Sequence, residues 1–197
     1  MPQTDVVASL KRIFLNSQNG RRHVAYFAAV PDALVPYMAP FWWHMDKLWA
    51  LDLPVMEIPA HELALFLDVP YWRGSEDSRL FRHTARDVLS DPVTHANHWA
   101  QTMAADLDYP IMLLEYGDRT YLLDGFHRML KAKILGLDCL PAKFVPKELL
   151  FTILIQEGFL GELNQLRQQT PCLITSARQV ALELQDDSPE GTFPEWR

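Results

Sequence analysis

The sequence contains few cysteines and glycines and no long apolar run. Cys139 and Cys172 are the only cysteines among 197 residues, so a disulfide framework is not expected and both thiols are predicted to be free in a reducing compartment. Glycine occurs 8 times and proline 14 times, which argues against collagen-like architectures. No apolar run approaches the roughly 18 residues that span a bilayer. Asp5 and Lys11 interrupt the stretch where a signal peptide would lie, so we expect a cytoplasmic protein without a membrane partner.

Cationic residues are also scarce. Lys and Arg number 18 against 25 Asp and Glu, which gives a formal net charge of -7. Nonspecific nucleic-acid binding depends on neutralising phosphates, so this charge disfavours a general nucleic-acid partner and leaves only a local basic patch open. Hydrophobic residues make up 49% of the chain and charged residues 22%, as in ordinary globular domains, so the chain is expected to form a core.

Hydrophobic periodicity predicts short strands alternating with helices. The predicted strands cover residues 24–30, 55–58, 111–114, 120–123 and 140–145, and the predicted helices cover 33–51, 61–67, 91–106, 126–135, 148–165 and 176–185. In the first helix, the spacing of Trp42, Met45 and Trp49 indicates one face, which we expect to lie in the core or over the sheet rather than to bind a partner. The strands at 111–114 and 120–123 flank a glycine-containing turn and predict a hairpin.

The helix predicted to begin at Asp91 has two distinct faces. Val93 and Met103 belong to an apolar face that is expected to be buried, while His95, His98 and Thr102 share another face. The spacing of His95 and His98 would suit two ligands of a metal, but no third ligand is identifiable, so we expect a surface or pocket-lining pair.

The most informative segment is the strand, tight turn and helix around Asp124. A helix N-terminus offers unpaired amides and a positive dipole end, and Gly125 would let an anion approach the backbone. His127 and Arg128 add donors, Lys131 lies one turn further along, and residues 126–147 carry a net charge of +4. Asp124 could hold Mg²⁺ beside a phosphate or act on a substrate proton. A structural role is equally open: an N-cap for Asp124, a tight turn at Gly125, and a surface ion pair for Arg128.

The sequence LLDGFHRMLKAKILGLDCLPAKFV resembles the ParB/sulfiredoxin superfamily. The shared pattern is a strand, a DG-x-HR-type turn, a helix that ends in LG, and a strand that contains a PA pair. The upstream segments VMEIPAHEL and ADLDYPIML are similar to the first strand and the hairpin of that superfamily. The resemblance covers roughly residues 53–148, about half of the chain.

The resemblance implies a nucleotide site and separates the branches of the superfamily. Phe126 stands where sulfiredoxins carry their cysteine, so sulfiredoxin chemistry is not expected, and the turn differs from the GERR-like turn of the CTP-binding partition proteins. The DG-x-HR members include ATP- or ADP-dependent kinases of small molecules, and some members with ATPase and nuclease activity. By resemblance Gly125, His127 and Arg128 would bind nucleotide phosphates. The predicted roles of the remaining residues are the metal or the transferred phosphoryl group for Asp124, further nucleotide contacts for Lys131 and His98, and the base for either Glu57 or Glu62.

These observations predict an α+β domain with a small mixed sheet flanked by helices. Residues 1–52 would form an aromatic-rich elaboration, 53–148 the ParB/sulfiredoxin-like domain, and 149–197 a helical extension packed on it. The leading hypothesis is a protein that binds ATP, CTP or ADP with Mg²⁺ and serves as an ATP-dependent phosphotransferase of a small-molecule acceptor or as an ATPase. The alternatives are a ParB-like nuclease or DNA-binding accessory protein of a mobile element, and a non-catalytic interaction protein on the same fold.

Overall fold

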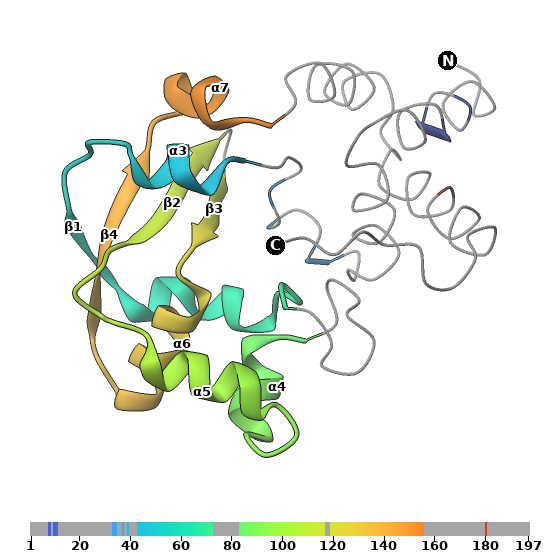
Figure 1. The fold of residues 1–197 in the computed structure, drawn as a ribbon, viewed down its shortest axis with the longest axis vertical. Coiled ribbons are helices and arrows are strands. Elements are labelled where there is room, and N and C mark those ends of the chain that lie inside the picture. The colour runs from blue at the N-terminus through green and yellow to red at the C-terminus, as the bar shows by residue number, and fades with distance from the viewer. Residues whose placement is uncertain are drawn as a thin grey trace. The chain divides into compact units, whose positions relative to one another are not determined.

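The computed structural model describes three continuous stretches of the chain, residues 43–72, 83–116 and 119–155. It also describes a few isolated residues, which are Ala8, Leu10, Lys11, Ala33, Leu34, Tyr37, Ala39 and Val180. The chain divides into two compact units, Ala33–Glu157 and a second unit made of Met1–Asp32 with Gly158–Arg197. The continuous stretches all belong to the unit Ala33–Glu157, whose fold is described below (Figure 1).

Four strands form one mixed sheet in the order β1-β4-β2-β3. Their bounds are Met56–Pro59 for β1, Ile111–Tyr116 for β2, Arg119–Asp124 for β3 and Cys139–Val145 for β4. Strands β2 and β3 form an antiparallel hairpin, so the predicted hairpin is confirmed. Strand β4 returns parallel to β2, and β1 pairs with β4 in the antiparallel sense. The mixed sheet with flanking helices confirms the predicted α+β class.

Helices cover both ends of this sheet. The α-helices are α3 (Met45–Trp49), α4 (Ala85–Ser90), α5 (Ala96–Ala104), α6 (Phe126–Leu135) and α7 (Leu150–Ile153), and the 3₁₀ helices are η2 (Ala60–Asp68) and η3 (Lys147–Leu149). Helix α6 packs against α4, α5 and η2, while α3 packs against α7. In Figure 1 these two groups lie toward opposite ends of the strands.

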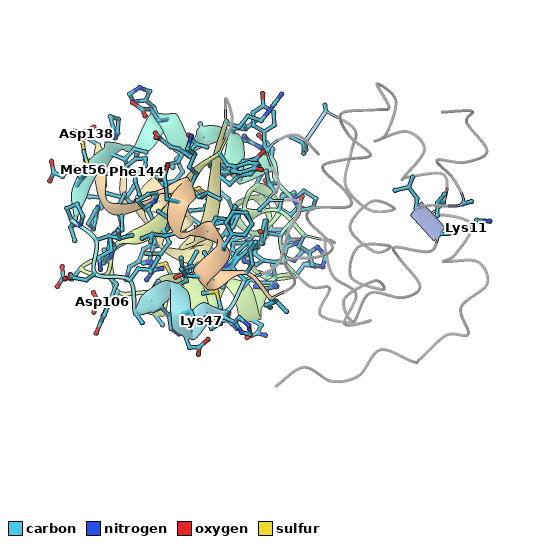
Figure 2. The ribbon with its side chains drawn as sticks, turned by 90° about the horizontal axis from the view of Figure 1, so that it is seen from above. Lys11, Lys47, Met56, Asp106, Asp138 and Phe144 are labelled. Atoms are coloured by element: carbon cyan, nitrogen blue, oxygen red, sulfur yellow. The ribbon has the colours of Figure 1, made fainter. Side chains whose placement is uncertain are left out.

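The core is built on β2 and α6. Four consecutive residues of β2, from Ile111 to Leu114, are buried, and because strand side chains alternate, both faces of β2 are covered. Leu130 of α6 is fully buried, and side chains fill the space between the sheet and the helices (Figure 2). Helix α6 ends where predicted, because Gly136 adopts the left-handed conformation of a C-terminal cap.

The aromatic segment differs from its prediction. Within its described residues the α-helix covers only Met45–Trp49, and Trp43 instead forms an isolated antiparallel bridge with Leu154. Leu48 is fully buried, whereas Trp49 is 61% exposed, so the prediction that Trp49 lies in the core is wrong. The physical reason is that α3 is held to the core through Leu48, and Trp49, the next residue along the helix, points to a different side.

Helix α5 also differs from its prediction. Helix α5 begins at Ala96 with His95 as its N-cap, so the predicted start at Asp91 is wrong. The carboxylate of Asp91 instead caps the turn that precedes the helix, since it accepts hydrogen bonds from the Thr94 amide (3.0 Å) and hydroxyl (2.7 Å). Val93 is 86% exposed and Thr102 is fully buried, so the predicted apolar face is the exposed one. Helix α5 packs on α6 through the side that carries His98 and Thr102. On that side the ring of His98 stacks on Trp72 and on His127 of α6.

The C-terminal prediction is wrong in one respect. The helix predicted over 148–165 does not run on beyond Ile153, where α7 ends, because Leu154 is extended and pairs with Trp43. Residues 147–149 form the separate 3₁₀ helix η3, and residues 156–165 lie outside the described part of the chain. The predicted strand at 24–30 lies outside the described residues, as does the helix at 176–185 apart from Val180. In the part of the chain that the structure describes, no helix is long and apolar enough to cross a membrane.

Candidate functional site

Gly125 links β3 to α6 in a conformation that requires glycine. Its φ is 112°, and it is the N-cap of α6, so the predicted N-cap role of Asp124 is wrong. A Cβ at this position would lie 2.5 Å from Cγ2 of Ile111. Ile111 therefore fills the space on the Cβ side, and the glycine is needed for backbone conformation and for packing on β2. The sequence-based reason for this glycine, open space for an anion, does not apply on that side.

The first turn of α6 presents backbone amides that precede the regular hydrogen bonds of the helix. The earliest intrahelical hydrogen bond is donated by the Met129 amide to the Gly125 carbonyl (2.8 Å), so the amides of Phe126, His127 and Arg128 precede the regular ladder. Gly125 has no side chain that could cap them, and the first turn contains no Asp or Glu. Such a turn carries the positive end of the helix dipole and suits an anion.

Asp124, Arg128 and Trp49 form one connected polar group at this turn. Nη2 of Arg128 donates to Oδ2 of Asp124 at 2.5 Å, and the indole Nε1 of Trp49 donates to the same oxygen at 3.1 Å. The side chains of Arg128 and Asp124 are 18% and 24% exposed, so the pair is mostly buried. An incoming phosphate would compete with Asp124 for the guanidinium, and Asp124 would then be available to a cation.

His98 and His127 lie together on the other side of the same turn. Nδ1 of His98 and Nε2 of His127 are 3.4 Å apart. Both rings stack on the indole of Trp72, each with a centroid distance of 4.7 Å and an interplanar angle of 14°. Trp72 is held in place by a two-way backbone pairing with His83. The packing therefore fixes both imidazoles beside the first turn of α6.

His127 is uncharged at neutral pH in this environment. Burial, first of all, and then the charges of His98 and Arg128 lower the pKa of His127 to about 4, while Asp124 acts in the opposite direction. A neutral imidazole offers one donor and one acceptor. His127 can thus donate one hydrogen bond to an anion, but it adds no positive charge to the site.

Lys131 is engaged by helix α5. Its ammonium group donates to the carbonyl oxygens of Met103 (2.8 Å) and Ala105 (2.6 Å), which lie at the C-terminal end of α5. A cation at this position satisfies the terminal carbonyl groups and the negative end of the helix dipole. A phosphate contact of Lys131 stays a prediction, and its geometry supports a structural role.

Glu57 and Glu62 are exposed and lie on other elements than Asp124. Glu57 is in the edge strand β1, next to Met56 at the periphery of the domain (Figure 2). Two strands separate β1 from β3, which corresponds to about 14 Å between Glu57 and β3 at the usual strand spacing. Glu62 lies in the first turn of η2. The structure thus does not bring Glu57 to Asp124, and the choice of a base stays a prediction.

The two histidines of the helix predicted over 91–106 have different partners. His95 makes an edge contact with the ring of His83, at a centroid distance of 4.5 Å, whereas His98 contacts His127 and Trp72. Over the described ranges, no group of three or more His, Cys, Asp or Glu side chains is arranged to hold a metal ion. Asp124 by itself suits Mg²⁺ only in combination with phosphate oxygens, because Mg²⁺ usually takes one or two carboxylates with substrate phosphates and water.

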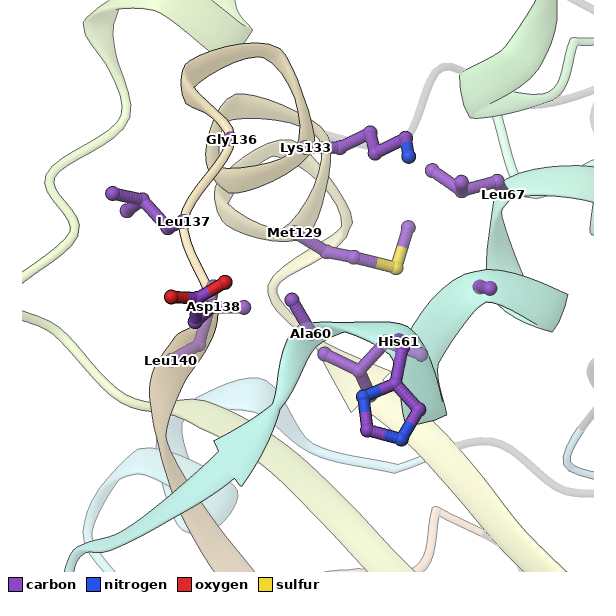
Figure 3. A pocket seen from close by; sticks show the side chains of 11 residues that line it. Ala60, His61, Leu67, Met129, Lys133, Gly136, Leu137, Asp138 and Leu140 are labelled. Atoms are coloured by element: carbon purple, nitrogen blue, oxygen red, sulfur yellow. The ribbon is translucent and has the colours of Figure 1, made fainter.

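A cavity of about 340 Å³ lies on another side of α6 (Figure 3). Its walls come from η2, from one side of α6 at Met129 and Lys133, from the following turn and from the start of β4. Met129 and Leu67 form part of an apolar floor, and Lys133, His61 and Asp138 are polar groups in its lining. The residues of the first-turn group, Asp124, Gly125, His127 and Arg128, do not line this cavity.

The comparisons with known proteins identify no relative. No family model, no curated protein and no solved structure matches this chain. The fold defines an α+β domain with a four-stranded mixed sheet, and the candidate site of this domain is the turn between β3 and α6.

Two residues of the site were not among the predicted site residues. Trp49 and Trp72 contact Asp124 and His127 from segments that lie 75 and 55 positions earlier in the chain. The density of aromatic residues in 41–49 sets this segment apart in the sequence, but it predicts burial rather than a contact with Asp124. No local pattern pointed to Trp72.

Proposed function

We propose that the turn between β3 and α6 binds the phosphate groups of a nucleotide. The observation that carries the proposal is the mostly buried guanidinium of Arg128, held on the first turn of a helix that has no acidic residue within that turn. Arg128 can grip phosphate through two parallel hydrogen bonds. The helix amides would bind further phosphate oxygens, and His127, with His98 behind it, would donate one hydrogen bond.

The charge of the site favours a nucleotide that carries Mg²⁺. Asp124 neutralises Arg128, and His127 is neutral, so the first-turn group is close to zero net charge before the ligand enters. When phosphate takes over Arg128, the carboxylate of Asp124 can help to hold the cation. Mg²⁺ would neutralise charge on the phosphate groups.

Transfer of the terminal phosphate to water or to a small-molecule acceptor is the reaction class that such a site serves. The contribution of this chain would be positioning and charge stabilisation by Arg128 and the helix amides. Glu57 and Glu62 both stay candidates for the base. Neither is chosen by a direct contact with Asp124.

Titration calorimetry with ATP, ADP and CTP in the presence of Mg²⁺ tests the proposal. We expect binding to the wild-type chain and a loss of at least ten-fold in affinity in Arg128→Ala and Asp124→Asn. Arg86→Ala is the matched control, because Arg86 forms a comparable ion pair with Asp68 on an exposed surface. The absence of binding to all three nucleotides, or equal effects of Arg128→Ala and Arg86→Ala, would remove the proposal.

The exposure of Trp49 favours a second candidate, a non-catalytic interaction protein on the same fold. In that case the aromatic surface would act without the phosphate site, and nucleotide would neither bind nor alter it. A nuclease or DNA-binding function also stays a prediction. It requires DNA binding that weakens steeply with salt, and a gel-shift series at increasing ionic strength tests it.

A further inference from the structure

Trp49 combines high exposure with a fixed position. It is 61% exposed, although a large aromatic side chain gains much from burial. Its neighbour Leu48 is fully buried and anchors α3 to the core. The indole N–H of Trp49 donates to Oδ2 of Asp124 at 3.1 Å, which ties one edge of the ring to the candidate site.

The position of this ring is set by the same carboxylate that pairs with Arg128. Both donors use Oδ2 of Asp124, so the indole and the guanidinium approach one oxygen atom. The donor edge of the indole is turned to the carboxylate, and the rest of the ring supplies the exposed aromatic surface. An exposed aromatic ring is thus held next to the group that would bind phosphate.

We propose that Trp49 is the stacking platform for the base of the nucleotide. This inference rests on the proposed phosphate site and adds a specificity element to it. Stacking of a base on an aromatic side chain contributes roughly ten- to hundred-fold in affinity and tolerates different bases. The site would therefore prefer a nucleoside triphosphate to inorganic tripolyphosphate, and it would favour purines because their larger rings overlap more of the indole.

The experiment compares Mg²⁺-ATP with Mg²⁺-tripolyphosphate on four forms of the full chain. The measured quantity is the ratio of the two dissociation constants, obtained by calorimetry, because this ratio isolates the nucleoside part of the ligand. The variants are Trp49→Leu, which removes both the ring and the hydrogen bond, and Trp49→Phe, which keeps an aromatic ring but removes the hydrogen bond. Phe151→Leu is the matched control, because Phe151 of α7 is 59% exposed, much as Trp49 is, but lies on another helix than Trp49.

We expect the wild-type chain to bind ATP at least ten-fold more tightly than tripolyphosphate. The preference should fall to about two-fold or less in Trp49→Leu, and it should be largely retained in Trp49→Phe and Phe151→Leu. Tripolyphosphate affinity should change by less than about three-fold in Trp49→Leu, because Arg128 and the helix amides remain in place.

The other outcomes each overturn the inference in a recognisable way. If Trp49→Leu weakens ATP and tripolyphosphate equally, Trp49 acts only through Asp124. If the wild-type chain does not discriminate between the two ligands, or if Trp49→Leu keeps the preference, the ring does not stack on a base. If neither ligand binds the wild-type chain, the proposed phosphate site itself is wrong, and this inference falls with it.

Discussion

Asp124 and Arg128 face each other across the start of α6, with Oδ2 and Nη2 2.5 Å apart. Asp124 ends strand β3, and Arg128 lies on the first turn of the helix, so the ion pair spans the turn at Gly125. The same two groups therefore stabilise the turn and constitute the proposed phosphate site. Because of this double role, the free energy of unfolding and the affinity for nucleotide have to be measured separately on each variant.

We expect Asp124→Asn to lower the free energy of unfolding by about 1–2 kcal/mol, because a mostly buried guanidinium loses its counter-charge. Asp68→Asn removes the carboxylate partner of Arg86, and this pair is about half exposed. It should lower the free energy of unfolding clearly less than Asp124→Asn does, because solvent screens an exposed ion pair. Urea denaturation at neutral pH measures both. Losses of equal size would show that burial gives the Asp124–Arg128 pair no special weight.

Gly125→Ala is expected to destabilise the chain by about 2–4 kcal/mol, as the sum of a left-handed backbone penalty and a clash. The clash arises because the new Cβ would lie 2.5 Å from Ile111 Cγ2. Gly136→Ala is the matched control, since Gly136 also has a positive φ, of 67°, but open space around a Cβ. The control should cost about 1 kcal/mol. Thermal or urea unfolding that gives the same loss for both variants would contradict the packing of Gly125 on Ile111.

The low pKa of His127 predicts a loss of stability in acid. Its pKa is about 4 in the folded chain and 6.5 when unperturbed, so the unfolded chain takes up a proton that the folded chain does not. The contribution is fully present above about pH 6.5 and declines as the pH falls from there toward 4. Because the ring is partly solvent-accessible, we expect a loss of about 1–2 kcal/mol over this range.

His127→Gln should flatten this part of the pH profile of the unfolding free energy. An NMR titration of the imidazole checks the cause directly. A His127 resonance that titrates near pH 6.5 would refute the expectation, as would an unchanged pH profile in the variant.

Lys131→Met separates a structural role from a phosphate contact. The variant removes two hydrogen bonds to the carbonyl groups of Met103 and Ala105, so the free energy of unfolding should fall by about 1 kcal/mol. ATP affinity should change by less than about two-fold, because the ammonium is already engaged. Urea denaturation and calorimetry on the same preparation measure the two effects. A ten-fold loss of ATP affinity without a loss of stability would place Lys131 in the phosphate site instead.

Local patterns were reliable where the chain forms one element with its sequence neighbours. The hairpin of β2 and β3 and the helix from Phe126 to the cap at Gly136 follow from turn residues and from the apolar spacing alone. The side of a helix that is buried was less predictable. In α5 the predicted apolar face is exposed at Met103, and the buried side carries Thr102 and faces Trp72 and His127.

The α+β class and the polar residues grouped at the turn after β3 can be predicted from the sequence, because both depend on residues that are close together in the chain. The distant side chains that join this group become visible only in the folded structure. The hydrogen bond of Trp49 with Asp124 spans 75 positions, and the pair of His98 and His127 spans 29. Periodicity specifies which elements form, but contacts of this kind depend on how the elements pack, and that packing is set by side-chain shapes from the whole domain.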